Sequence, residues 1–206
     1  NITIEREQGG KKKEFTMELY GQPQEGWIVM TDDGHPYLYT EIQSENDWRT
    51  MEVFDLKGEE IRHVGTSNDS PHGALLNDPD GFYLTRRVDA LGTYDAYRKF
   101  HVGESGMPVA ENDVYTKVNV CDSKEDEAAL VSTRELPVTM LEAGGSEKEE
   151  RLPAGTKYYV RATDLENFVD MELSDGRRCR LAVKKSDKGW GFEIDGVYEE
   201  DCFEFI

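Results

Sequence analysis

The stretch VDMELSDGRRCRLAV, residues 169–183, decides the fold class of this chain. Apolar and polar residues alternate on both sides of Ser-Asp-Gly (174–176), and a period of two is typical of a strand with one buried face. Asp-Gly between two alternating runs predicts a β-hairpin, because its tight turn needs residues that tolerate positive φ. We expect one buried face made of Val169, Met171, Leu173, Cys179, Leu181 and Val183.

The rest of the sequence repeats this pattern of short strands and tight turns. Turns such as TDDGHP (31–36) and LKGE (56–59) contain Gly and Asp, which favour turn conformations. Helical periodicity is nearly absent, and the one candidate helix is SKEDEAALVS (123–132), with Ser123 as its N-cap. The sequence therefore predicts an all-β protein with two lobes. An antiparallel meander or barrel covers 1–120, a linker with a candidate short helix covers 121–134, and a small barrel covers 135–206.

A weak internal repeat lies within the first lobe. A shift of 46 positions aligns residues 37–56 with 83–102. The aligned pairs include Tyr37 with Tyr83, Leu38 with Leu84, Ile42 with Val88, Trp48 with Tyr94, Met51 with Tyr97, and Phe54 with Phe100. A unit of this size suits a propeller blade, but two copies do not close a propeller. Two long β-hairpins also resemble each other at this level, and we favour that interpretation, with a continuous meander over 15–120.

The balance of charge excludes one class of partner. The 206 residues include 24 basic and 43 acidic side chains, which gives a formal net charge of −19. Such a surface repels nucleic-acid phosphates and anionic lipid headgroups, so nucleic-acid binding is not expected. No apolar run approaches the roughly 20 residues that a membrane-spanning helix needs. The chain starts at Asn1 rather than Met, so either a leader was cleaved or the sequence was trimmed, and we expect a signal peptide or lipid-anchor sequence to be missing from it.

The C-terminal part resembles the bacterial Src-homology-3-like (SH3-like) domain. The segment LPAGTKYYVRA (152–162) matches the motif by which a strand of that family begins, and the later Asp-Gly hairpin matches its next motif. The matching residues are Leu152, Pro153, Gly155, Thr156 and Tyr158, then Leu173, Asp175 and Gly176. The chain departs from the family where Phe168 lies near the position of its usual Trp, and where RCRLAV replaces its closing Gly-Tyr-Val.

The whole chain also looks like secreted proteins and lipoproteins of gut Firmicutes. The segments that suggest this are MEVFDLKGEEI (51–61), YRKFHVGESGMPV (97–109) and IDGVYEEDCFEFI (194–206). This resemblance implies an extracytoplasmic location, either secreted or lipid-anchored to the bacterial envelope, and it carries no activity with it.

Motifs for catalysis are missing from the sequence. There is no Gly-x-Ser-x-Gly, Ser-x-x-Lys, His-Glu-x-x-His or Cys-x-x-Cys, and GWGFEIDG (189–196) lacks the third glycine of a dinucleotide-binding loop. The histidines are scattered, with His35 and His72 in turns and His63 and His101 in strands, where half-exposed sheet residues are commoner than ligands. We therefore predict no catalytic residue, no metal ligand and no cofactor.

Two further features have a structural and a functional interpretation. In NDPDG (77–81), Asn77, Asp78 and Asp80 offer oxygen atoms for calcium, but the EF-hand spacing is missing, and a type I turn explains the same residues. Cys121, Cys179 and Cys202 allow either one disulfide with one free thiol or three unpaired thiols, and burial is expected for each, since unpaired cysteine is among the most buried residue types. Pairing of one of them with a histidine as a nucleophile is the less favoured alternative.

Aromatic residues are the remaining candidates for a binding site. Trp190 lies between two glycines near a predicted hairpin, and Tyr158 or Tyr159 could join it as a stacking surface. The sequence thus favours a non-catalytic binding protein whose ligand is a cell-wall peptide, a glycan or another protein. A hydrolase with a low-pKa cysteine or a carboxylate pair between the lobes is the first alternative. A subunit that pairs with a partner through exposed β edges is the second.

Overall fold

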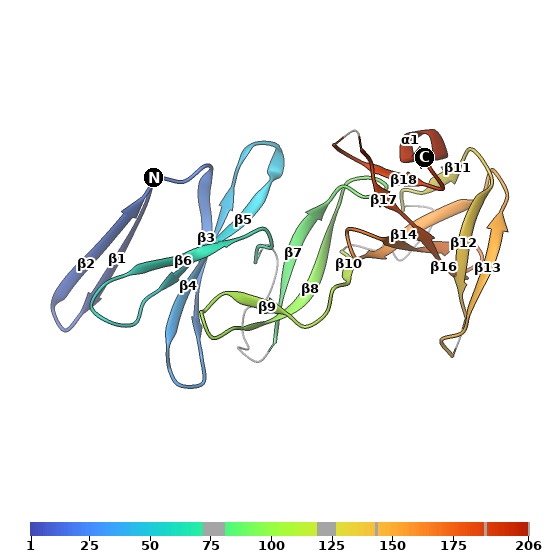
Figure 1. Ribbon diagram of the computed structural model, residues 1–206. Coiled ribbons are helices and arrows are strands. Elements are labelled where there is room, and N and C mark those ends of the chain that lie inside the picture. The colour runs from blue at the N-terminus through green and yellow to red at the C-terminus, as the bar shows by residue number, and fades with distance from the viewer. Residues whose placement is uncertain (72–80, 119–126, 143, 188, 206) are drawn as a thin grey trace. The chain divides into compact units, whose positions relative to one another are not determined.

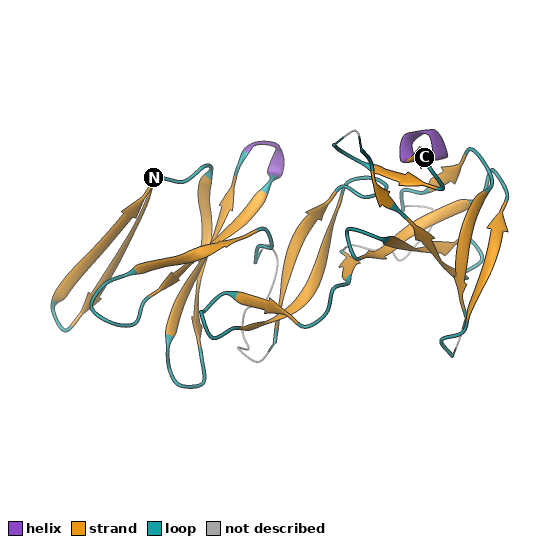
Figure 2. Ribbon diagram, in the orientation of Figure 1, coloured by secondary structure: helices purple, strands orange, loops and turns teal. Residues whose placement is uncertain are grey.

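The structure of the protein is a computed structural model, which describes residues 1–71, 81–118, 127–142, 144–187 and 189–205. Nearly all of its regular structure is antiparallel strand, which confirms the all-β prediction (Figures 1 and 2). The chain forms two compact units. The N-terminal unit contains residues 1–87 and 97–112, and the C-terminal unit contains residues 88–96 and 113–206.

The N-terminal unit is built from hairpins. Its elements are β1 (Ile2–Gln8), β2 (Lys11–Met17), β3 (Gln22–Met30), β4 (Pro36–Gln43), the 3-10 helix η1 (Glu45–Asp47), β5 (Arg49–Asp55), β6 (Arg62–Ser67), β9 (Pro108–Ala110), and most of β7 (Phe82–Val88) and β8 (Tyr94–Val102). Strands β3 to β6 form a four-stranded sheet in chain order, and β1 pairs with β2 alone. The sequence therefore runs as a meander through this sheet.

Strands β4 and β5 are buried on both faces. On one face, Tyr37, Tyr39 and Val53 pack with Phe82 and other residues of β7 and β8. On the other face, Phe54 packs with residues of the β1–β2 hairpin. A strand that is covered on both sides lacks clear alternation in its sequence. This explains why the burial along β4 and β5 is nearly continuous.

The C-terminal unit is also built almost entirely of strands. Its elements are β10 (Tyr115–Lys117), β11 (Leu130–Ser132), β12 (Leu136–Leu141), β13 (Glu147–Leu152), β14 (Lys157–Thr163), β15 (Phe168–Leu173), β16 (Arg178–Ala182), β17 (Lys184–Lys185), β18 (Phe192–Ile194), β19 (Val197–Tyr198), α1 (Glu199–Cys202) and β20 (Phe203–Phe205). The strands follow the order β13-β12-β16-β15-β14-β10, and β11 pairs with β14 and β20. A small sheet of β17, β18 and β19 lies beside α1 (Figure 1).

The hairpin predicted at 169–183 is confirmed. Strands β15 and β16 pair with Met171 opposite Cys179 and Val169 opposite Leu181. The turn closes through the Gly176 N–H, which donates to the Leu173 carbonyl at 2.9 Å. All the residues expected on its inner face are buried, namely Val169, Met171, Leu173, Cys179, Leu181 and Val183. The period-two pattern identified this face because the other side of the hairpin carries charged residues.

The candidate helix at 123–132 is wrong where the structure describes it. Residues 123–126 lie outside the described part, while Leu130–Ser132 forms strand β11. This strand is stabilised by pairing with β14 on one side and β20 on the other, contacts that local helix propensity does not register. The β7–β8 hairpin contributes residues to both compact units.

The internal repeat corresponds to two hairpins whose buried faces differ. The aligned segments are the β4–β5 and β7–β8 strand pairs. However, Tyr37 is 5% exposed and its counterpart Tyr83 is 47% exposed, while Met51 is fully buried and Tyr97 is 36% exposed. The rings of Tyr83 and Tyr97 instead contact each other edge to face. The repeat therefore matches strand positions without matching the environment of the side chains.

Candidate functional site

Trp190 lies in an exposed turn of the small β17–β18–β19 sheet. The residue is 63% exposed, and its two neighbours Gly189 and Gly191 both have positive φ values, of 89° and 68°. The turn is closed by Ser186, whose N–H donates to the Gly191 carbonyl at 3.0 Å and whose carbonyl accepts the Gly189 N–H at 3.2 Å. The backbone that carries Trp190 is thus fixed by hydrogen bonds while the indole faces solvent.

Tyr198 holds the indole of Trp190 in place. The two rings meet edge to face, with centroids 5.4 Å apart and planes at 81°. A glycine is required at 191, because a Cβ atom there would lie 2.4 Å from the Tyr198 hydroxyl. The contact orders the Trp190 side chain before any ligand arrives, which lowers the entropy cost of binding.

The segment behind this pair is anchored by a buried carboxylate. Glu199 accepts hydrogen bonds from the backbone N–H of Leu91 at 2.8 Å and of Phe192 at 3.0 Å. Burial raises the pKa of Glu199, and these two hydrogen bonds only partly oppose the rise. The anchor ties α1 to β18 and to residue 91, and so fixes the position of the neighbouring Tyr198.

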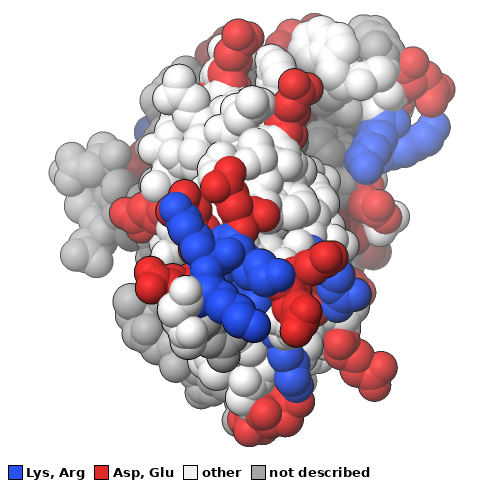
Figure 3. Space-filling model, turned by 90° about the vertical axis from the view of Figure 1, so that its left-hand side faces the viewer, with Lys and Arg blue, Asp and Glu red and all other residues white. Residues whose placement is uncertain are grey.

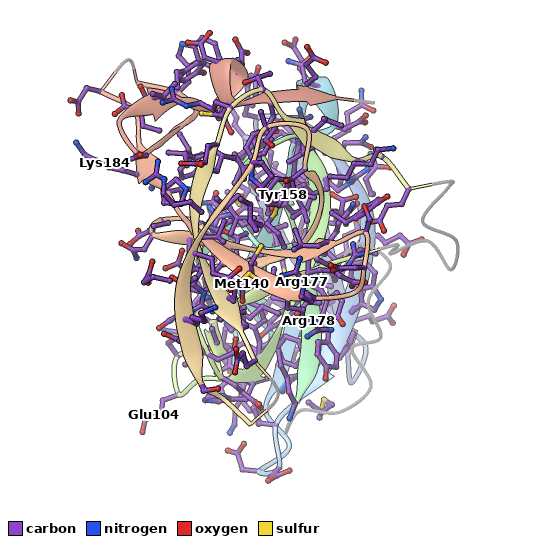
Figure 4. The ribbon with its side chains drawn as sticks, turned by 90° about the vertical axis from the view of Figure 1, so that its right-hand side faces the viewer. Glu104, Met140, Tyr158, Arg177, Arg178 and Lys184 are labelled. Atoms are coloured by element: carbon purple, nitrogen blue, oxygen red, sulfur yellow. The ribbon has the colours of Figure 1, made fainter. Side chains whose placement is uncertain are left out.

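Tyr158 and Tyr159 do not join Trp190 at the surface. Tyr158 is fully buried, with its ring edge to face against Phe203 at 5.7 Å (Figure 4). Tyr159 is 5% exposed, and the Arg161 guanidinium lies 5.6 Å from its ring centre. Adjacent strand residues point to opposite faces, but β14 is covered on both, so neither ring is open to a ligand. Of the three predicted residues, Trp190 alone is exposed.

Ion pairs cover the outer face of the C-terminal sheet. Arg161 donates to Glu127 at 2.6 Å and 3.0 Å and to Glu172 at 3.0 Å. Arg180 pairs with both oxygens of Asp170, and its guanidinium lies 3.6 Å from the centre of the Phe168 ring. Because each of these charges is already matched, this face stabilises the sheet and does not offer an obvious ligand site.

A groove that sequence reasoning missed lies at the end of the 169–183 hairpin. Its volume is about 640 Å³, and its lining comes from the end of β12, the middle of β13, the turn at Gly176 and the start of β16. The lining residues are Met140, Leu141, Glu142, Glu150, Gly176, Arg177 and Arg178, of which Met140, Arg177 and Arg178 are labelled in Figure 4. Arg177 is held by Asp175 at 2.8 Å. No sequence motif predicts this groove, because its residues come together only when three strands pair.

The described cysteines are not activated for catalysis. Cys179 and Cys202 are both free and fully buried. Burial raises the pKa of Cys179 to about 12 and also raises the pKa of Cys202. A catalytic thiol needs a lowered pKa and access to substrate, so neither residue supports the hydrolase alternative. Cys121 lies outside the described residues.

Two histidines of the N-terminal unit bind buried carboxylates. The Nε2 atom of His35 lies 2.7 Å from Asp55, and that of His63 lies 2.6 Å from Glu52. Burial alone would raise the pKa of Asp55, but hydrogen bonds from His35, Arg62 and a backbone N–H lower it overall. These pairs satisfy buried carboxylates inside the fold. His72 and the calcium candidates Asn77, Asp78 and Asp80 lie outside the described residues.

Among the residues that the structure describes, no group of three or more His, Cys, Asp or Glu side chains could hold a metal ion. The helices within the same residues are all too short and too polar to cross a membrane. Neither a family model, nor a characterised protein, nor a solved structure matches the chain.

Proposed function

We propose that the protein is a non-catalytic binding protein of the bacterial envelope, located outside the cytoplasm and either secreted or lipid-anchored. Its ligand is a cell-wall component, a peptide or a glycan, that stacks on Trp190. The single observation that carries this proposal is an indole that is 63% exposed and yet held by Tyr198. An exposed large aromatic costs solubility, and it is expected where an apolar or sugar face must be recognised.

The surroundings of Trp190 support a polar ligand rather than a lipid chain. Lys184 and Lys185 of β17 are exposed in the same small sheet, and neither forms an ion pair with a described residue. Ser186 and Glu193 of this sheet are hydrogen-bonded to each other at 3.1 Å. An aromatic platform on a sheet that also carries cationic side chains suits a glycan or peptide that carries carboxylates.

We also propose that residues 135–206, which lie within the C-terminal unit, form an SH3-like barrel. The turn before β14 contains Gly155 at a φ of 83°, and Thr156 donates its N–H to the Pro153 carbonyl at 3.3 Å. Strand β14 pairs with β15, and the Asp-Gly turn leads directly into β16. This strand, turn and hairpin order is the one on which the resemblance rests, and small barrels of this kind commonly bind peptides.

The experiment is co-sedimentation of the full chain with purified Gram-positive cell-wall sacculi. The wild type is compared with Trp190→Ala and with Trp48→Ala, which removes a 39%-exposed tryptophan from the other unit. We expect the wild type and Trp48→Ala to sediment with the wall and Trp190→Ala to remain in solution. Equal sedimentation of both variants, or no sedimentation of the wild type, contradicts wall binding through Trp190. Circular dichroism of each variant confirms that it is folded.

A further inference from the structure

The tip of the β1–β2 hairpin carries a cluster of positive charge on one face. Arg6 lies directly opposite Lys13, and Gln8 lies opposite Lys11. Because alternate residues share a face, Arg6, Lys11 and Lys13 continue the same face that buries Ile2 and Ile4 nearer the other end of the hairpin. The inner face of this hairpin thus changes from apolar to basic toward its turn.

These cations differ from Lys12, which lies between them in the sequence. Lys12 points to the opposite face, where its ammonium pairs with Glu5 at 2.6 Å. Lys11 and Lys13 are exposed and form no ion pair with any residue that the structure describes. Arg6 donates to the carbonyl oxygens of Leu56 and Gly58, and its Nε atom is buried without an acceptor among the described residues.

This arrangement is unfavourable for the protein alone. Like charges directly opposite each other on paired strands destabilise the pair, and a buried N–H without an acceptor destabilises the fold as well. A chain with 43 acidic residues has many carboxylates with which to neutralise three cations. On the side of the molecule that holds this hairpin, Lys and Arg side chains gather near the centre of the surface, with Asp and Glu around them (Figure 3).

We propose that this basic tip binds a dianionic phosphate group. Arg6, Lys11 and Lys13 line a pocket of about 150 Å³ together with Gly58 and Glu59. Since a water molecule occupies about 30 Å³ of liquid, this space accommodates one tetrahedral oxyanion. The Arg6 guanidinium is engaged with carbonyl groups, so the lysines act as point charges, a role in which lysine binds phosphate. Two ammonium groups and one guanidinium outweigh the single Glu59 carboxylate.

The overall charge of −19 does not prevent this binding. Interactions between exposed charges are screened beyond about 8–10 Å at physiological ionic strength. An anion in the pocket therefore responds chiefly to the residues that line it. The inference is independent of the Trp190 surface, which belongs to the other unit.

The test is a calorimetric titration of the full chain with inorganic phosphate. The ionic strength is held constant, with chloride as the background anion. We expect saturable one-site binding that Lys13→Gln and Lys11→Gln each weaken about tenfold, the effect of losing one charge-assisted contact. Lys12→Gln is the matched control, because it removes the same charge from the same turn on the opposite face. It should change the affinity less than twofold.

Absence of binding by the wild type at millimolar phosphate overturns the proposal. The proposal is also overturned if Lys12→Gln and Lys13→Gln weaken the affinity for phosphate equally. That result would show that phosphate is attracted by the net charge of the hairpin and not bound at a site. A parallel titration with glycerol phosphate identifies the source of the group. Affinity equal to that of inorganic phosphate points to a phosphomonoester on a larger molecule, and loss of affinity points to the free ion.

Discussion

The guanidinium of Arg161 donates two hydrogen bonds to the carboxylate of Glu127, at 2.6 Å and 3.0 Å. The Glu127 side chain is only 2% exposed, and Lys117 donates to it as well, at 3.0 Å. This carboxylate links the segment before β11 to β10 and β14. The C-terminal sheet is therefore stabilised partly by a buried charge that has two cationic partners.

The link between Arg161 and Glu127 predicts loss of stability in acid. Burial alone would raise the pKa of Glu127, but hydrogen bonds from Arg161 and Lys117 outweigh it and lower the pKa overall. A group whose folded pKa lies below its unfolded value of about 4.3 stabilises the fold above that value and loses its contribution as the pH falls through the folded pKa. We expect Glu127→Gln to lower the unfolding free energy of the C-terminal unit by about 3 kcal/mol at pH 7.

Urea denaturation at several pH values checks this prediction. The difference between wild type and Glu127→Gln should narrow as the pH falls below about 4, because the wild-type carboxylate then becomes neutral. Glu166→Gln is the control, since the Glu166 side chain is exposed and has no hydrogen bond or ion pair with a described residue. A Glu127→Gln protein as stable as the wild type at pH 7 would show that the pair contributes nothing.

Two glycines with the same backbone angle should respond differently to substitution. Gly58 and Gly106 both have a φ of 88°, so alanine is strained at either position by about 1–2 kcal/mol. At Gly106 an added Cβ would also lie 2.1 Å from the ring of Tyr37, whereas at Gly58 it would meet no atom within 4 Å. We expect Gly106→Ala to cost at least 2 kcal/mol more than Gly58→Ala, roughly the cost of overpacking a core. Thermal unfolding of the two variants measures the difference, and equal melting temperatures would contradict the close approach.

The pair Met51 and Tyr97, which the internal repeat aligns, tests whether the repeated hairpins are equivalent. Met51 is fully buried between neighbours in the N-terminal unit, while Tyr97 is 36% exposed. We expect Met51→Ala to destabilise that unit by about 2–5 kcal/mol and Tyr97→Ala by less than about 1.5 kcal/mol, mainly through its contact with Tyr83. Chemical denaturation gives both values. Similar losses would mean that the two positions share one environment.

Thiol reactivity separates a binding protein from a cysteine hydrolase. In a Cys121→Ser background, we expect native protein at pH 8 to be almost unreactive toward a disulfide reagent, because burial raises the pKa values of both Cys179 and Cys202. After denaturation both thiols should react at the rate of a free cysteine. Rapid modification of either one in the native state would restore the cysteine-nucleophile alternative.

Local patterns predicted the hairpins and missed what depends on pairing between distant segments. The alternation at 169–183 located its buried face correctly, because one side of that hairpin is apolar and the other is charged. Residues 130–132 carried a helical pattern and became a strand, since their partners come from β14 and β20. The β7–β8 hairpin contributes to both units, and no composition shift marks that exchange.

The candidate site was only partly accessible to sequence reasoning. Glycines on both sides of Trp190 indicated an exposed turn, and the residue is exposed. Tyr158 and Tyr159 were predicted as ligand contacts because they lie in a strand near Trp190 in the expected barrel. A position in a strand does not show whether the faces of that strand are covered by other residues. The groove at Arg177 and Arg178 and the basic tip at Arg6 and Lys13 arise from register between strands, which a single sequence does not specify.

The most direct measurement of the central claim is the tryptophan fluorescence of the protein during titration with soluble fragments of digested cell wall. The wild type, Trp190→Phe and Trp48→Phe are titrated in parallel. If a wall ligand stacks on Trp190, emission of the wild type and of Trp48→Phe changes saturably with one midpoint, and Trp190→Phe shows neither the change nor binding. An unchanged response in Trp190→Phe, or no response in any of the three proteins, would contradict a wall-binding site at Trp190.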